Sequence, residues 1–447
     1  MQPDLSGIAP EAAALYQRDL KSVAGIEKLR FFPLAVVSGE GSWLIEAGGR
    51  RVLDLTSTWT ASGLGYGHPA VVEAMTLAVQ APPGSGGLSS VHPASVGLAE
   101  DLLACVPGEG DRRVYLGHAG SDACDVALRA ARMATGRRRI IAFEHSYHGG
   151  IGVALGASGV HVEAGSTAAD PDVVFVPYPN PYRPPSSEAS ADEAALAQSF
   201  SAVERALALG DVAALIVEPF LADGGMIVPP PGFLRGVEAR CRAANVLLIC
   251  DEVKVGLGRS GLLHAFQIDG ITPDLVCFGK VLGGGLPLSA CVGPASVLDG
   301  PSAAALLTTA GNPICAAVGR AVLKTIIGDD LATRAAHAGE RLRAGLRAAG
   351  LPHIGDVRGH GLSIGCELVE DRTTKEPARK FAAKVVYRAF ELGAAVFYVG
   401  GNTLEITPPL IITDAEVDEA VEILTGAIRD VAAGRVSDEL VAPYAGW

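Results

Sequence analysis

The sequence predicts an α/β protein, with a large domain built on a mostly parallel sheet between helices and a smaller α+β domain. The first observation behind this prediction is a set of continuous apolar runs of strand length, without polar alternation. Such strands are buried on both faces, as in a parallel sheet covered by helices. Second, Ala-rich stretches with helical periodicity separate these runs. Third, after about residue 320 the pattern changes to long helices that flank short strands, which is typical of an α+β unit.

The predicted elements begin with a helix over residues 12–20 and a short hairpin formed by residues 43–46 and 51–54. A helix over residues 122–133 follows the first strand of the large domain. The strands expected in that domain are residues 113–116, 140–143, 212–217, 246–250 and 275–278. The proline-rich residues 178–185 and the Ser/Ala/Glu stretch after them predict a loop or surface excursion.

The C-terminal part of the chain has a different pattern. The elements expected there are helices over residues 332–349, 378–392 and 414–433 and strands over residues 362–368, 394–397 and 403–406. We therefore expect three segments along the chain. These are residues 1–60, which pack with the small domain, residues 61–320, which form the large domain, and residues 321–447, which form the small domain.

Composition excludes several classes of protein. Of the 447 residues 49% are hydrophobic and 19% charged, which excludes a disordered chain. The net charge of −13 argues against a nucleic-acid binder, which needs a basic face, and against attachment to an anionic membrane. The sequence starts without a leader pattern and contains no run of roughly 18 uninterrupted apolar residues, so we expect a cytoplasmic protein. The eight cysteines include no C-x-x-C pair and are expected to be buried, reduced thiols, and we expect no metal site.

Small residues lie between a predicted strand and a predicted helix in the run Gly117-His-Ala-Gly-Ser-Asp-Ala123. Backbone N–H groups and a hydroxyl at the start of a helix can bind an anion, typically a phosphate. A helix cap formed by Ser121 and Asp122 explains the same residues equally well.

Two charged residues follow the ends of predicted strands. Asp251 directly follows the strand over residues 246–250, where a carboxylate can hold a positive charge on a heterocyclic nitrogen. A capping or ion-paired aspartate is an equally good interpretation of this residue alone. Lys280 follows the strand over residues 275–278 and leads into three glycines. A lysine in such a place can form a Schiff base if burial lowers its pKa.

Two further residues lie near turns. Tyr147 precedes His-Gly after a strand and can stack on a flat ring, or it is an ordinary packed tyrosine. Thr308 precedes a tight turn, where turn capping is the simpler interpretation when it is considered alone. Together, a lysine, a strand-end aspartate, a phosphate loop and a stacking ring are what pyridoxal phosphate requires. Open α/β sheets bind ligands at the carboxyl ends of their strands, so these residues predict one site.

At these residues the sequence resembles the class III aminotransferases of pyridoxal phosphate fold type I, from about residue 25 to the C-terminus. The most specific part of the match is the run Asp251-Glu-Val-Lys-Val-Gly-Leu-Gly-Arg-Ser-Gly261 together with Lys280. The other matching stretches are residues 120–123, 147–149, 218–219, 308–313 and 408–410. The resemblance implies that Lys280 forms the Schiff base and that Asp251 binds the pyridine nitrogen.

The same resemblance implies that Tyr147 and Val253 lie on the two faces of the cofactor ring. It implies that Gly120 and Ser121 bind the cofactor phosphate. Thr308 would reach the phosphate of the neighbouring subunit, so the resemblance also implies a homodimer.

Two residues depart together from the aminotransferase pattern. Asp223, in the run after Glu218-Pro219, stands where those enzymes carry a glutamate. Glu405 stands where they carry an arginine that pairs with this glutamate and grips the substrate carboxylate. The change from arginine to glutamate reverses the charge, so a substrate carboxylate would be repelled, and at least one of two nearby carboxyls would tend to hold a proton. The expected substrate is therefore neutral at its carbonyl end, as an amide, ester or lactam is, unless a different arginine grips a carboxylate.

These departures resemble the racemases of α-amino-ε-caprolactam and of amino acid amides, over nearly the whole chain. Further stretches that carry this resemblance are residues 29–34, 63–69, 178–184 and 445–447. It implies that Trp59 and Tyr147 border the substrate, and that Asp223 joins Lys280 as acid and base. Because its arginine partner is missing, Asp223 is not locked in a gate pair.

The leading prediction is a pyridoxal phosphate-dependent racemase of α-amino lactams or α-amino acid amides. A class III aminotransferase is the alternative, because the two reactions share the removal of the Cα proton and differ in where a proton returns. A third interpretation is a non-catalytic protein of this fold, which the intact Lys280 and Asp251 disfavour.

Overall fold

The computed structural model describes residues 3–185 and 190–444, and the chain divides into two compact units. One unit contains residues 1–68 and 333–447, and the other contains residues 69–332. The three segments predicted from the sequence, with boundaries after residues 60 and 320, stay a prediction. Among the described residues, no helix is long and apolar enough to span a lipid bilayer.

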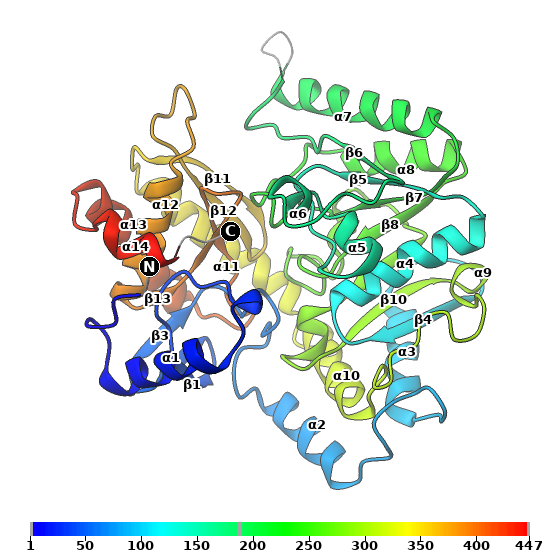
Figure 1. Ribbon diagram of the computed structural model, residues 1–447, viewed down its shortest axis with the longest axis horizontal. Coiled ribbons are helices and arrows are strands. Elements are labelled where there is room, and N and C mark those ends of the chain that lie inside the picture. The colour runs from blue at the N-terminus through cyan, green and yellow to red at the C-terminus, as the bar shows by residue number, and fades with distance from the viewer. Residues whose placement is uncertain (1–2, 186–189, 445–447) are drawn as a thin grey trace. The chain divides into compact units, whose positions relative to one another are not determined.

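The unit of residues 69–332 is built on a seven-stranded sheet (Figure 1). Its strands, in spatial order, are β4 (Arg112–Gly117), β10 (Ser289–Pro294), β9 (Leu275–Phe278), β8 (Leu247–Asp251), β7 (Val212–Val217), β5 (Arg139–Phe143) and β6 (Val173–Val176). The strands from β9 to β6 are parallel, whereas β10 is antiparallel to both of its neighbours. The sheet is therefore mostly parallel, and the predicted α/β fold class is confirmed.

The α-helices described in this unit are α2 (Pro69–Gln80), α3 (Pro93–Cys105), α4 (Gly120–Thr135), α5 (Gly152–Gly156), α6 (Gly159–Glu163), α7 (Ala191–Ala208), α8 (Phe233–Ala243), α9 (Ala295–Leu298) and α10 (Pro313–Gly328). Of these, α3, α4, α7, α8 and α9 contact strands of the sheet. Successive side chains of β5 point to opposite faces of the sheet, and both faces are buried. Ile140 belongs to the core cluster that includes the apolar face of α4, whereas the ring of Phe143 packs edge-on against Phe233 of α8. The strands accordingly run between α4 and α8 (Figure 1).

The unit of residues 1–68 and 333–447 holds two four-stranded sheets. The first consists of β1 (Val36–Glu40), β2 (Trp43–Glu46), β3 (Arg51–Asp54) and β13 (Ala394–Ala395), and the second of β11 (Ile354–His360), β12 (Ser363–Leu368), β15 (Thr403–Ile406) and β14 (Phe397–Val399). Its helices are α1 (Pro10–Ser22), α11 (Leu331–Ala348), α12 (Arg379–Leu392), α13 (Asp414–Ala432) and α14 (Asp438–Val441). The predicted hairpin is confirmed as the antiparallel pair β2 and β3.

The predicted loop over residues 178–185 begins in the interior rather than on the surface. Tyr178 is buried, and its hydroxyl donates hydrogen bonds to the carbonyls of Glu218 and Pro219 at 3.1 and 3.0 Å. The start of this loop is therefore anchored to the segment that follows β7. The Ser/Ala/Glu stretch at residues 186–189 lies outside the described residues.

Candidate active site

The predicted phosphate loop connects β4 to the first turn of α4, which begins at Gly120. Asp122 holds this loop, because its Oδ2 accepts hydrogen bonds from the backbone N–H groups of His118 and Ala119 at 2.8 and 3.2 Å. Ser121 Oγ accepts a hydrogen bond from Gly150 N at 3.1 Å. The partial positive charge of a helix N-terminus favours an anion at this place.

Glycines allow this loop to lie close to two other segments of the site. A Cβ atom on Gly120 would lie 2.4 Å from Val253 Cγ1, and one on Gly279 would lie 2.9 Å from Gly120 N. The loop, Val253 and the segment that carries Lys280 are therefore brought together. Lys280 is half-buried and has a φ of +45°, a strained value for a residue with a side chain.

Asp251 ends β8 and is buried. Its Oδ2 lies 2.8 Å from His148 Nδ1 and accepts a weaker hydrogen bond from Cys124 Sγ at 3.4 Å, while its Oδ1 accepts one from Val253 N at 3.0 Å. A carboxylate only accepts hydrogen bonds, so His148 must carry its proton on Nδ1. These three donors hold the Asp251 carboxylate in one orientation, as a partner for a protonated ring nitrogen requires.

Glu218 connects the loops of Tyr147 and Asp223. Its buried carboxyl accepts hydrogen bonds from the backbone N–H groups of Tyr147 and Ala222 at 3.0 and 3.1 Å. Burial raises the pKa of Glu218 to about 8, and the charges of Asp251 and Asp223 add to this rise. The residue therefore fixes the backbone of two predicted site loops.

Asp223 has a cationic partner that the sequence analysis does not predict. Lys254 Nζ lies 2.5 Å from Asp223 Oδ1, and the two side chains are only 5% and 8% exposed. The missing arginine of the gate pair therefore does not leave Asp223 without a cationic partner, because Lys254 supplies one. The partner comes from the segment after β8, three residues beyond Asp251.

Tyr147 and His161 share the electrostatic environment of this ion pair. Burial raises the pKa of the Tyr147 phenol, Asp223 adds to the rise, and Lys254 and a hydrogen bond with Ser121 oppose it. Burial lowers the pKa of His161, and Asp223 opposes this shift. The two rings lie 5.4 Å apart between centroids. The side chains of Asp223, Lys254, Tyr147 and His161 thus lie close together, and Tyr147 connects them to Ser121 of the phosphate loop.

Trp59 and Glu405 belong to the other unit. Trp59 lies in a left-handed turn, since residues 57–60 have φ values of 47, 52, 56 and 69°. Its ring is half-buried and lies 4.7 Å from that of Phe397. Glu405 is buried on β15, paired with Phe397 of β14. The predicted contacts of Trp59 and Glu405 with substrate stay predictions.

Thr308 is exposed, and it lies on the surface next to Gly86, where a Cβ atom would be 2.2 Å from the Thr308 carbonyl oxygen. Its neighbour Thr309 bonds to the phosphate loop, with Oγ1 2.7 Å from His118 Nε2. The predicted reach of Thr308 into a neighbouring subunit stays a prediction.

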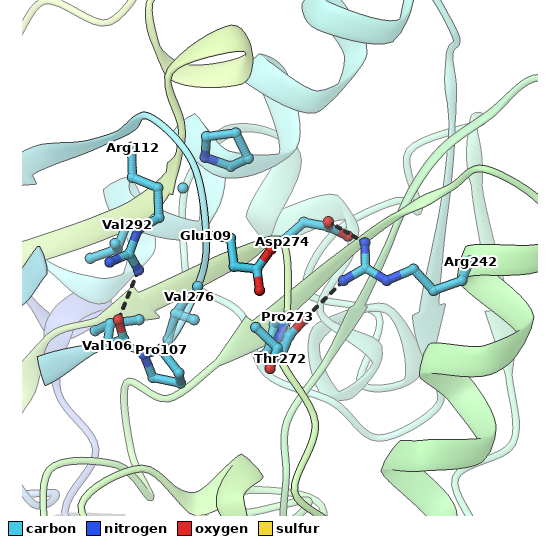
Figure 2. Close-up of a pocket in the computed structure, with 13 residues that line it drawn as sticks. Val106, Pro107, Glu109, Arg112, Arg242, Thr272, Pro273, Asp274, Val276 and Val292 are labelled. Atoms are coloured by element: carbon cyan, nitrogen blue, oxygen red, sulfur yellow. Dashed lines mark hydrogen bonds and ion pairs between the residues drawn. The ribbon is translucent and has the colours of Figure 1, made fainter.

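A cavity of about 490 Å³ lies at the other end of the strands of this sheet, where β4 and β9 begin (Figure 2). It is lined by the residues just before β9 and at the start of β4, whereas Asp251 and Lys280 follow the ends of β8 and β9. Its two arginines are engaged, because Arg112 donates to the carbonyl of Val106 and Arg242 pairs with Asp274 (Figure 2). Arg112 also donates to the carbonyl of Leu103. This cavity is separate from the predicted site.

Four residues of this site are not predicted as site residues from the sequence, and one of them, His161 on α6, lies outside every stretch quoted above. His148 and Lys254 each adjoin a residue that the sequence analysis names, and Glu218 lies in a stretch that it quotes only for the family match. Lys254 stands between two valines just after Asp251, and a charge between two apolar residues there is a usable signal for it. The residues that the structure gathers fit pyridoxal phosphate, which needs a lysine for its aldehyde, a fixed carboxylate for its ring nitrogen and a helix N-terminus for its phosphate.

Comparisons with known proteins agree with this fit. A family model described as "Aminotransferase class-III" matches residues 26–428. The isoleucine 2-epimerase of Lentilactobacillus buchneri is 34% identical over 99% of this chain and 100% of its own length, and the leucine/methionine racemase of Thermococcus litoralis is 35% identical over 94% and 96%. The 4-aminobutyrate aminotransferase of Mycobacterium leprae is 33% identical over 89% and 91%. Among solved structures, the omega transaminase of Pseudomonas jessenii in complex with PMP has a TM-score of 0.88 and 27% identity, covering 96% of this chain and 99% of its own.

Proposed function

Because this chain belongs to the class III aminotransferase family and is a pyridoxal phosphate enzyme of fold type I, we propose that it is a racemase acting at the Cα of small α-amino compounds. The observation that carries the proposal is the position of Asp223. This carboxylate is buried in the same unit as Lys280, and its charge acts on the Tyr147 phenol. The names of the two racemase relatives support the same reaction class.

The chemistry divides between the cofactor and the chain. When bound, pyridoxal phosphate withdraws electrons from the substrate and so acidifies its Cα–H bond. Lys280 holds or moves the proton on one side of Cα, and Asp223 does so on the other. Tyr147 and Val253 would enclose the cofactor ring, Asp251 would hold its nitrogen, and Gly120 with Ser121 would hold its phosphate.

We propose α-amino lactams and α-amino acid amides as the substrates. Glu405 in place of the gate arginine removes the usual grip on a carboxylate, and Trp59 with Tyr147 would border the neutral end of the substrate. Free α-amino acids are a second candidate class. They are favoured by the names of the racemase relatives and by Lys254, a buried cation in the site.

The experiment is chiral analysis of single enantiomers incubated with the enzyme, pyridoxal phosphate and no keto acid. We use L-α-amino-ε-caprolactam, L-alaninamide and L-isoleucine. Formation of the opposite configuration at Cα supports the proposal, and the ranking of the three compounds identifies the substrate class. If configuration changes for none of them, while addition of a keto acid gives amino transfer, the enzyme is an aminotransferase like its relative from Mycobacterium leprae.

We propose further that the enzyme is a cytoplasmic homodimer. None of the residues of α2, all of which the structure describes, is buried. Large apolar side chains of α2 and of the loop after it are exposed, namely Val72, Leu77, Val79, Leu88 and Val91. This loop packs beside the turn of Thr308, through the hydrogen bond from Gly87 N to the Ala310 carbonyl at 3.1 Å. A second copy covering this surface would bury it and receive Thr308.

A further inference from the structure

We infer that Lys254 is a positioning residue for Asp223: it replaces the missing gate arginine as counter-ion and holds Asp223 as an oriented carboxylate. The inference rests on the proposed racemase function. It adds a residue to that function, and it states which proton transfer the residue controls.

The geometry of the pair carries this inference. Lys254 Nζ and Asp223 Oδ1 are 2.5 Å apart, in a place where the side chains are 5% and 8% exposed. A buried carboxylate without a cation tends to take up a proton, because burial penalises its charged form. The Lys254 ammonium therefore supplies the counter-charge that the buried Asp223 carboxylate needs, and a carboxylate is the form that can accept a proton from Cα.

The position of Lys254 in the chain makes it part of the site. It follows Val253, which packs against Gly120 of the phosphate loop. The Tyr147 phenol is affected by Lys254 as well as by Asp223. Because Lys254 occupies Asp223 Oδ1, the other carboxylate oxygen is oriented away from the ammonium and is the one offered to substrate.

The proton balance follows from this arrangement. For one enantiomer, the proton that leaves Cα bonds to the Asp223 carboxylate, its electron pair stays on the substrate, and the Lys280 ammonium returns a proton to the opposite face. For the other enantiomer, Lys280 as amine takes the proton and the protonated Asp223 returns one. Lys254 should thus control the first removal step much more than the second.

Several other groups titrate in this environment and must be considered in any pH profile. Asp223 affects the proton equilibria of Tyr147, His161 on α6 and Glu218 at the end of β7. Asp251 at the end of β8 affects Tyr147 and Glu218. A change in the pH–rate profile that Lys254 causes through Asp223 must therefore disappear in the Asp223→Asn variant, where residue 223 carries no charge.

The test is a double-mutant cycle with Lys254→Met, Asp223→Asn and the double variant, with Lys254→Arg to retain the charge and Lys324→Met as a control on the exposed part of α10. For each enantiomer we measure deuterium incorporation at Cα in D2O, the pH–rate profile and the visible absorbance of the bound cofactor. We expect Lys254→Met to slow exchange from one enantiomer by about tenfold more than from the other, and to move the acidic limb of its profile up by about one pH unit. Lys254→Arg should restore both to within about threefold of the wild type.

In the Asp223→Asn background, Lys254→Met should have little further effect, because the group through which it acts is gone. An equal loss for both enantiomers, additive effects in the cycle, or an arginine variant as impaired as the methionine variant would overturn the inference. If Lys254→Met alone does not fold, Lys254→Gln, which removes the charge but keeps a polar side chain, replaces it, and the same exchange ratio between the two enantiomers decides the question. A wild-type enzyme that interconverts no enantiomers would instead overturn the proposed function.

Discussion

Lys254 Nζ lies 2.5 Å from Asp223 Oδ1, and both side chains are buried. The loss of the gate arginine, which the sequence shows at Glu405, therefore does not leave Asp223 without a cation. The positive charge comes instead from the segment that also supplies Asp251 and Val253. The ion pair with Lys254 therefore links Asp223 to the segment that we expect to bind the cofactor.

Lys280→Ala should abolish the visible absorbance of the bound cofactor and nearly all turnover. The lysine both tethers the cofactor and moves a proton at Cα, so its loss removes both roles together. The measurement is an absorbance spectrum with added pyridoxal phosphate, followed by the chiral assay. Lys324→Ala, on the exposed part of α10, should leave both unchanged. A Lys280→Ala enzyme with the wild-type spectrum and rate would refute the assignment.

Asp251→Asn should leave the cofactor bound but slow the reaction by about a hundredfold or more, because a neutral partner no longer favours the protonated ring nitrogen. Binding is followed by absorbance and the reaction by chiral analysis. His148 and Val253 N remain as neighbours of the amide, so the fold should be retained. A loss of less than about tenfold, or ~1.4 kcal/mol, would contradict the proposed role.

The elements that position the site were predictable because they are apolar runs buried on both faces. The bounds of β7 and β9 agree with the prediction residue for residue, and β8 differs by one residue. β10 is not predicted from the sequence, because its run Ser289–Pro294 contains glycine and proline and lies antiparallel within a parallel sheet. Its side-chain pattern alone does not distinguish a strand from a loop.

Contacts between distant loops could not be predicted. Asp223 and Lys254 are 31 residues apart in the chain, on the segments that follow β7 and β8, and only the sheet brings them together. The left-handed turn of residues 57–60 is also set by tertiary contacts, since serine, threonine and tryptophan do not favour positive φ. It is held by Asp54, whose buried carboxylate accepts hydrogen bonds from Thr56, Ser57 and Tyr66.

Leu77→Glu should weaken the proposed homodimer. The residue lies on α2 and is 61% exposed, so a charge there costs little in the monomer but would be buried in the interface. Sedimentation velocity should show a shift from dimer to monomer, with a loss of activity if Thr308 serves the neighbouring subunit. Leu209→Glu, at a 56% exposed position after α7, is the matched control and should remain dimeric. Two variants with the same sedimentation would exclude α2 from the interface.

The free energy of unfolding should fall as the pH rises from about 5 to 8. Burial raises the pKa of Glu218 to about 8, whereas an unfolded glutamate titrates near its ordinary value of 4.5. Between these values the folded chain holds a proton that the unfolded chain releases, so rising pH favours unfolding. Urea unfolding at pH 6 and pH 8 would measure this, and Glu218→Gln should reduce the difference between the two values. The exposed Glu419→Gln on α13 is the control, and an equal pH dependence in all three proteins would contradict the assignment.

Asp223→Asn should lower racemisation in both directions while preserving the visible spectrum of the cofactor. A racemase must exchange protons on both faces of Cα, and one lysine on a fixed arm serves one face most easily. The asparagine neither accepts nor donates the second proton, so a full cycle fails in both directions, yet Lys280 still removes the proton of one enantiomer. Deuterium incorporation without inversion should therefore persist for that enantiomer and be lost for the other. Asp223→Glu, which keeps the charge beside Lys254, should retain part of the racemisation. Wild-type racemisation by Asp223→Asn in both directions would remove Asp223 from the mechanism and leave Lys280 to serve both faces.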